Sequence, residues 1–220
     1  MGTDNYYSVK EDVQKYIDGC KTKMNVRTHK VFGRAVLAGM MIAFGASASN
    51  VAAHAVTNVG LSRLVAGCVF PVGLMMVVLL GAELFTGDCL MAMGNAEGAC
   101  TIWDLIKFLF VVYVGNFVGS ILLAVVNVIS GQLNYSAGLL GAYTIKVAMG
   151  KVNMSFGQAL CSGILCNILV CAAVLVCGRV CGLFRGKNAP AEDAPCVPLR
   201  LARTGGLLPR AAARLRCGRI

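Results

Sequence analysis

Charge is scarce in this sequence. Charged residues make up 14% of the chain, against about 25% in an average soluble domain, while hydrophobic residues make up 57%. Between residues 35 and 178 there are only four basic and four acidic side chains, and residues 64–82 contain none. This shortage of charge excludes an ordinary soluble globular domain.

The sequence contains four long apolar runs. A stretch of about 20 apolar residues, rising about 1.5 Å per residue, crosses the roughly 30 Å hydrocarbon core of a bilayer. The runs therefore predict an all-α membrane protein with four transmembrane helices. They span residues 35–53, 64–82, 108–129 and 156–178.

Metal-binding and catalytic patterns are also lacking. The eleven cysteines form no CxxC pair, and they do not combine with histidines at the spacing of a zinc site. Five of them lie within the apolar runs, where we interpret them as small packing residues. Because the sequence contains neither a nucleophile–base pair nor a cluster of metal ligands, we expect no enzyme activity, no metal and no cofactor.

Basic residues gather at the two ends of the chain, which has a formal net charge of +10. Aromatic residues are not interleaved with them, and this disfavours a nucleic-acid partner. Basic residues that flank transmembrane helices usually face the cytoplasm. We therefore expect a multi-pass protein of the plasma or inner membrane, with both termini in the cytoplasm and an even number of crossings.

These patterns divide the chain into three parts. Residues 1–34 are expected to form a cytoplasmic segment with an amphipathic helix over 9–26, either a simple membrane anchor or a gate beneath a pore. Residues 35–178 form the membrane domain, with a polar connection at 130–155. Arginine replaces lysine in residues 179–220, which indicates a disordered basic tail attracted to anionic lipid or, as we favour, a foreign reading frame.

The stretch GAELFTGD at 81–88 interrupts the second apolar run. The apolar run 64–82 is followed by Glu83, Gly87 and Asp88, and apolar residues resume at Leu90. Non-helical backbone survives at membrane depth only where protein or a water-filled cavity satisfies its polar groups. The stretch is either an ordinary loop beyond a complete helix or, as we expect, a pore loop between two half-helices, suited to a small monovalent anion.

Four motifs, in order, resemble the formate/nitrite transporter family: FPVGL, GAELFTGD, YVGNFVGS and SFGQALCSGILCNILVC. The resemblance extends over about residues 30–178. It implies an aquaporin-like fold of six helices in an inverted repeat, assembled as a homopentamer with a pore in each protomer. It also implies transport of formate, nitrite, hydrosulfide or related small monovalent anions, with protons as a candidate co-substrate.

The matching motifs imply roles for individual residues. Thr86 would place its hydroxyl at the centre of the pore. Leu84 would form one hydrophobic constriction, while Phe70 and Leu74 would line the other. Lys151 would raise the potential for anions near the vestibule, unless it is a lysine that only reaches toward the membrane interface.

Three further residues are expected to brace the loop rather than contact the anion. Glu83 would hold the loop in place, and Asn167 would hydrogen-bond to it, unless Asn167 only joins two helices. Asn116 lies in the third motif between Gly115 and Gly119, where the GxxxG spacing favours close helix packing as the alternative role.

The family's second interrupted helix, which carries a pore histidine in a Glu-His motif, has no counterpart in this sequence, and neither has its last spanning helix. His29 and His54 lie in other contexts and cannot take the role of that histidine. We therefore expect four of the six helices, in a chain apparently truncated after the fourth. The alternative is a non-transporting four-helix membrane protein or an inactive fragment. A channel for neutral solutes is disfavoured, because paired Asn-Pro-Ala boxes are lacking.

Overall fold

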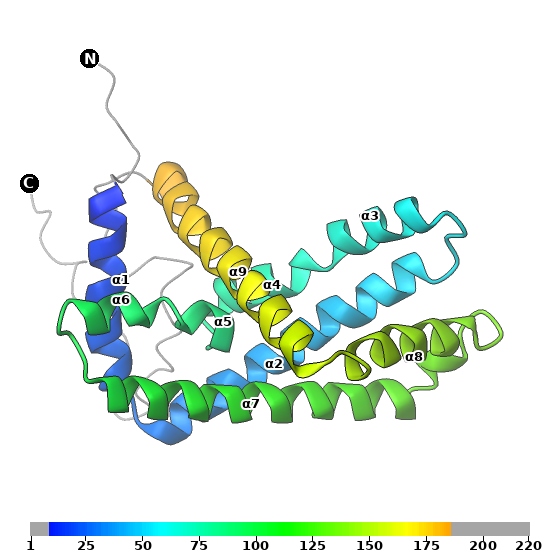
Figure 1. The fold of residues 1–220 in the computed structure, drawn as a ribbon, viewed down its shortest axis with the longest axis horizontal. Helices are drawn as coiled ribbons and strands as arrows, with labels where there is room; N and C mark the ends of the chain where they lie inside the picture. Colours follow the sequence, from blue (N-terminus) through cyan, green and yellow to red (C-terminus); the bar gives the residue numbers. More distant parts are fainter. Residues whose placement is uncertain (1–8, 186–220) are drawn as a thin grey trace, which may run out of the picture.

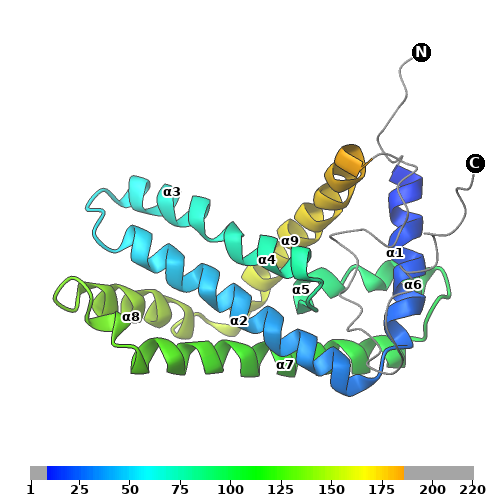
Figure 2. The same ribbon diagram turned by 180° about the vertical axis from the view of Figure 1, so that it is seen from behind.

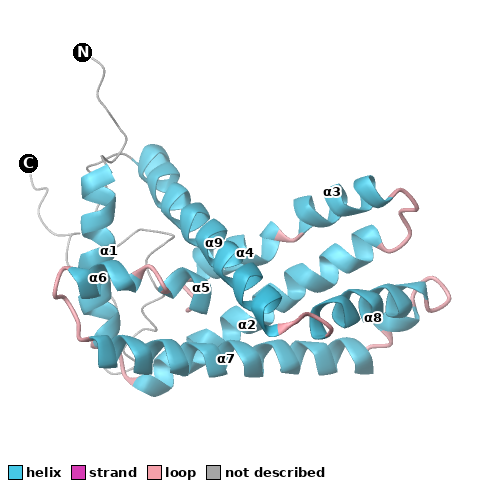
Figure 3. Cartoon of the chain, viewed as in Figure 1, coloured by secondary structure: helices cyan, strands magenta, loops and turns pink. Residues whose placement is uncertain are grey.

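The computed structural model describes residues 9–185, and every regular element in that range is a helix (Figures 1 and 3). Four spans, counting α3 and α4 as one, are long and apolar enough to cross a membrane, so the predicted helical membrane fold is confirmed. The elements are α1 (Val9–Met24), α2 (Thr28–Ala53), α3 (Val59–Val69), α4 (Pro71–Leu80), α5 (Phe85–Asp88), α6 (Met91–Ala96), α7 (Ile102–Ile129), the 3₁₀ turn η1 (Gln132–Asn134), α8 (Leu139–Val152) and α9 (Phe156–Arg185).

The helices extend beyond the apolar runs that predicted them. The run at 35–53 lies within α2, which already begins at Thr28, and the run at 108–129 lies within α7, which begins at Ile102. Polar residues such as Lys30 and Asp104 are accommodated in these first turns because they are exposed there. Hydropathy therefore locates the apolar part of each helix, and not its ends.

The connection at 130–155 contains a helix that we did not predict. After η1 the chain passes Gly138, which has a φ of 85°, and then forms α8. α8 is too short to cross a membrane and carries two lysines, so its hydropathy is unremarkable. It is held by packing, since Leu140 is 2% exposed and α8 contacts both η1 and α2.

Among the described helices, α2 and α7 share the most extensive contact, and they run side by side in both views (Figures 1 and 2). Glycines allow the two backbones to touch. A Cβ at Gly39 would collide with the backbone carbonyl of Asn116, and one at Gly119 would collide with the carbonyl of Val36. The GxxxG motif of α7 therefore allows α7 to pack closely against α2. Close packing is one of the two roles that the sequence indicates for this motif.

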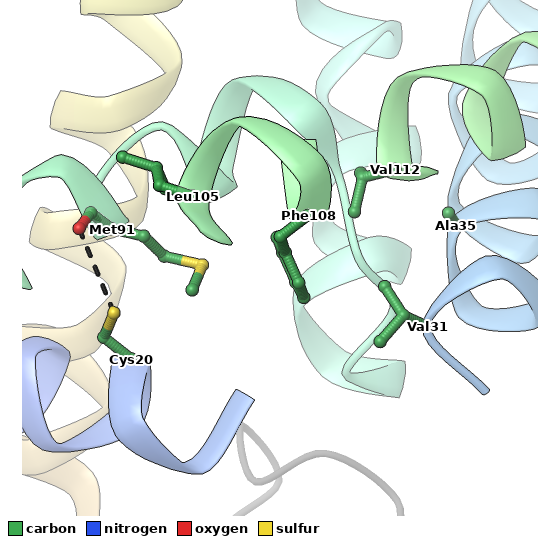
Figure 4. Close-up of a cluster of buried hydrophobic side chains, with 7 residues drawn as sticks. All are labelled: Cys20, Val31, Ala35, Met91, Leu105, Phe108 and Val112. Carbon is green, nitrogen blue, oxygen red and sulfur yellow. Dashed lines mark hydrogen bonds between the residues drawn. The ribbon is translucent and has the colours of Figure 1, made fainter. Parts of the chain in front are cut away.

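Helix α1 packs against one end of this pair, and its extent agrees with the amphipathic helix expected over 9–26. Figure 1 shows it running across the direction of α2 and α7, next to α6. A cluster of buried apolar side chains joins α1, α2, α6 and α7 (Figure 4). The cluster contains Cys20, Val31, Ala35, Met91, Leu105, Phe108 and Val112.

Helix α9 lies on the other side of the interruption and has few neighbours among the described residues. It contacts α5 and, more weakly, α1, and Figures 1 and 2 show it leaning across the bundle. None of the residues in its most apolar window is buried. α9 therefore meets the rest of the described chain mainly at the interrupted helix.

Candidate functional site

The second spanning helix is interrupted in two steps. α3 ends before Phe70, and Pro71 takes the first position of α4, where its missing N–H leaves no donor unpaired. α4 then ends at Gly81, whose φ of 60° lies in the left-handed region that glycine adopts without strain. Residues 82–84 form no helix, and α5 begins only at Phe85. A break in the helix therefore lies at GAELFTGD, while its role as a pore loop stays a prediction.

Asn116 of α7 binds the interruption to the long helix pair. Its Nδ2 donates to the Glu83 carbonyl at 2.9 Å and to the Ala35 carbonyl at 2.8 Å. Its Oδ1 accepts from the Phe85 N–H at 2.9 Å. The amide of Asn116 thus pairs the carbonyl before Leu84 and the N–H after it, two backbone groups that have no hydrogen bond within a helix.

Two buried acids lie in the interruption and in the short helix that follows it. Glu83 is 2% exposed and Asp88 is 4% exposed. The Lys23 ammonium of α1 lies 2.5 Å from a carboxylate oxygen of each, and the Arg34 guanidinium lies 3.6 Å from Glu83. Burial acts to lower the pKa of Lys23, but the charges of Asp88 and Glu83 outweigh it and hold that pKa above its usual range. Lys23 therefore stays charged and links α1 to the interruption.

Asn167 of α9 also reaches the interrupted helix. Its Nδ2 donates to the Cys89 thiol at 3.1 Å, just beyond α5. The Cys171 thiol, one turn further along α9, lies 3.0 Å from Asn167 Oδ1 and 3.2 Å from the Thr86 carbonyl. These contacts join α9 to α5.

A cavity of ≈ 270 Å³ lies beside the interruption. Leu74 of α4, Leu84 and Val174 of α9 contribute to its apolar wall, while Lys23 and Glu83 bring charge to it. The remaining lining residues are Tyr16, Gly19, Cys20, Val77, Val78, Gly81, Ala82, Gly87, Asp88, Leu90 and Met91. The cavity is therefore mostly apolar, with charged groups on the side of α1.

Leu74 and Phe70, which the motif groups at one constriction, have different surroundings, and their shared role stays a prediction. Leu74 lines the same cavity as Leu84, while Phe70 does not line it and is 42% exposed. Leu74 follows Phe70 by four positions, which corresponds to about 6 Å along a helix axis. Leu74 is thus one turn nearer to Gly81, and that turn brings it to Leu84.

The other candidates occupy different surroundings. Thr86 is half-buried on α5, and its carbonyl accepts from Cys171. Lys151 is exposed in the last turn of α8. The structure gathers most of the candidate residues around the interruption, and leaves Phe70 and Lys151 outside this group. The gathered residues are Leu74, Glu83, Leu84, Thr86, Asn116 and Asn167.

Four residues of the site were missed in the sequence. Val174 follows Asn167 by seven residues, or about two helical turns, so a search for residues on the same face would have found it. Cys171, one turn from Asn167, has the same signal. Lys23 and Arg34 carry no such signal, because they pair with acids in a distant part of the chain.

This geometry defines a class of protein: a multi-helix membrane protein whose second spanning helix is interrupted next to a mostly apolar cavity. The family model described as formate/nitrite transporter matches residues 10–182. The chain belongs to the formate/nitrite transporter family.

Individual relatives agree with this assignment. The formate channel FocA of Haemophilus influenzae is 39% identical over 154 residues, which cover 69% of this chain and 54% of that protein. The formate-nitrite transporter of Entamoeba histolytica is 40% identical over 157 residues, which cover 70% of this chain and 44% of that protein. The chain thus spans about half the length of these curated relatives.

A solved structure shares the fold. It is described as a pentameric formate channel with formate bound, and it is 32% identical to this chain with a TM-score of 0.63. The match covers 71% of this chain and 65% of that one. The similarity therefore includes most of the described helices.

Proposed function

We propose that this chain forms part of a transmembrane path for a small monovalent anion, of the size of formate, nitrite or hydrosulfide. The observation that carries the proposal is the interruption at 81–84, held by Asn116 next to the cavity that Leu74 and Leu84 line. A continuous helix would pair these backbone groups within itself, so a break whose groups must be paired by a side chain of another helix favours a functional role over simple packing.

The proposed roles follow from the chemistry of each side chain. Leu74, Leu84 and Val174 form the apolar narrowing, where an ion must shed water. Thr86 offers a neutral hydroxyl that donates a hydrogen bond to the dehydrated anion without trapping it, as a fixed charge would. Asn116, Asn167 and Glu83 position the loop. Lys151 and Phe70 act further along the path, where Lys151 raises the local concentration of anions.

The surroundings of the path are part of the proposal. The relatives of known structure include a pentameric channel, so we propose a homopentamer in which each protomer has its own path. We place the protein in the plasma or inner membrane with both ends of the described chain in the cytoplasm, in accord with the basic residues outside the apolar runs. The proposed activity of the protein is transport, with or without protons, and not catalysis.

The test is anion flux into liposomes that contain the chain, measured with and without the Thr86 hydroxyl. Thr86→Val keeps the shape of the side chain and removes its donor. We expect formate influx above that of empty liposomes, and a fall of about tenfold or more in the variant, because a hydrogen bond to a charged group contributes about 1.5–3 kcal/mol. Thr57→Val, in the exposed connection between α2 and α3, is the matched control and leaves influx unchanged.

Two results oppose the proposal. Equal influx for Thr86→Val and the unchanged chain would remove Thr86 from the path. Folded, inserted protein that admits no formate, nitrite or hydrosulfide would favour the alternative, a non-transporting membrane protein or an inactive fragment.

A further inference from the structure

Two cysteines from distant parts of the sequence meet where α1 packs on the bundle. The Sγ atom of Cys20 on α1 lies 3.5 Å from the Sγ atom of Cys100, in the connection between α6 and α7. Gly94 of α6 makes this approach possible, because a Cβ at that position would lie 2.8 Å from the Cys20 thiol. Figure 4 shows Cys20 at the edge of the buried cluster, facing Met91 of α6.

The two thiols differ in their access to solvent. Cys20 is 1% exposed, whereas Cys100 is partly exposed. Burial and, to a lesser extent, the neighbouring Cys100 together raise the pKa of the Cys20 thiol to about 11. Cys100 is also held in place, since Asn95 donates to its carbonyl at 2.8 Å and the next residue caps α7. Cys100 is therefore the thiol that an oxidant reaches first, with Cys20 already beside it.

We propose that Cys20 and Cys100 form a reversible disulfide when a peroxide reaches the membrane face on which α1 lies. The Cys100 thiolate attacks one peroxide oxygen and the O–O bond breaks, so that Cys100 becomes a sulfenic acid and hydroxide leaves, taking up the proton that the thiol released to form water. The Cys20 sulfur then attacks the sulfenic sulfur, and the S–O bond breaks as hydroxide takes the Cys20 proton and leaves as water. Two thiols are oxidised to one disulfide, and one peroxide is reduced to two waters.

The disulfide would fasten α1 to the end of the bundle. Lys23 lies three residues after Cys20 on α1 and contacts both Glu83 and Asp88. A covalent link one turn away from Lys23 prevents it from leaving these acids. Thiols facing a reducing cytoplasm remain reduced until an oxidant arrives, so the link forms only under oxidation. The inference concerns the covalent state of α1 and is independent of the ion that is transported.

Peptide mapping tests the link directly. The full chain in detergent is treated with hydrogen peroxide, its free thiols are alkylated, and it is digested with trypsin and a glutamate-specific protease. Cys20 then lies in peptide 16–21 and Cys100 in peptide 98–107, each with no other cysteine. We expect the two peptides to be joined in at least tenfold excess over the alkylated forms, and to separate with dithiothreitol.

A second readout follows α1 itself. Trypsin cleaves after the exposed Arg27, between α1 and α2. After oxidation we expect the α1 fragment to stay attached on a non-reducing gel, and to be released from Cys100→Ser. Cys68→Ser, which removes an exposed cysteine elsewhere, is the control and behaves as the unchanged chain. The inference is overturned if Cys20 stays alkylatable after oxidation, or if Cys100 proceeds to the sulfinic acid without joining Cys20.

Discussion

Asn116 uses both ends of one amide group to hold backbone from two elements. Its three hydrogen bonds, of 2.8–2.9 Å, reach α2, the residue before Leu84 and the residue after it. A shorter or apolar side chain would leave two carbonyls and one N–H without this partner. The interruption is therefore stable only with an amide at this position.

Replacing Asn116 by Ala should lower the stability of the folded chain by about 2–5 kcal/mol, since each polar group left unpaired in the interior costs about 1–3 kcal/mol and relaxation recovers a part. Thermal unfolding in detergent measures the change as a fall in Tm. Asn127→Ala, in the same helix but without these bonds, is the control and should unfold close to the unchanged chain. Similar Tm values for both variants would contradict this role of Asn116.

Lys23 is the residue whose charge links α1 to the interruption. Lys23→Met should destabilise the chain by about 2–4 kcal/mol, less than a fully buried pair, because 32% of the Lys23 side chain is exposed. The variant leaves Glu83 and Asp88 buried without their nearest cation. Lys21→Met, exposed on the same helix, should change Tm little. If both variants unfold alike, the ion pairs contribute nothing to stability.

The sequence predicted single residues well where a motif surrounds them. Glu83, Leu84, Thr86, Asn116 and Asn167 all lie at or against the interruption, although their roles in transport remain proposals. Pairing across the chain could not be predicted, because nothing near Lys23 in the sequence indicates that its partners lie in residues 83–88. The cavity that Leu74 lines could not be predicted either, since adjacent motif letters do not reveal which turn of a helix faces a cavity.

At the scale of the element, close packing of α2 against α7 depends on glycine. Gly39→Ala should destabilise the chain by about 3 kcal/mol or more, because the new Cβ meets the Asn116 backbone, which cannot move without disturbing the interruption. Gly33→Ala in the same helix meets no atom within 4 Å and is the matched control, expected to be neutral or slightly stabilising. Thermal unfolding of the two variants compares them, and a tolerated Gly39→Ala would refute the close contact.

The sequence predicted those helices and breaks that hydropathy, glycine or proline indicates. The apolar runs predicted the four spans, and the stretch GAELFTGD predicted the break that follows α4. α8 was missed because it is too short to cross a membrane and mixes apolar residues with lysine. Its helical state depends on packing against η1 and α2, which no local pattern indicates.

The whole molecule has an orientation that follows from its four spans. If both ends of the described chain face the cytoplasm, the connections at 54–58 and 130–138 lie on the opposite side, because an odd number of crossings separates them from residue 27. Reporter fusions after residues 27 and 178 should give a cytoplasmic signal, and fusions within the two connections should not. Opposite signals at 27 and 178 would show that the number of crossings is odd.

The central claim is that the interruption lines a water-accessible path, and thiol labelling at position 86 tests it most directly. Thr86→Cys is placed in a chain whose eleven native cysteines are replaced, and the membrane-embedded protein is treated with an impermeant, negatively charged methanethiosulfonate. Leu122→Cys, on the exposed face of α7, is the lipid-facing control. The account predicts labelling at position 86 at least tenfold faster than at position 122, and faster with the anionic reagent than with its cationic analogue. Equal rates at the two positions would contradict it.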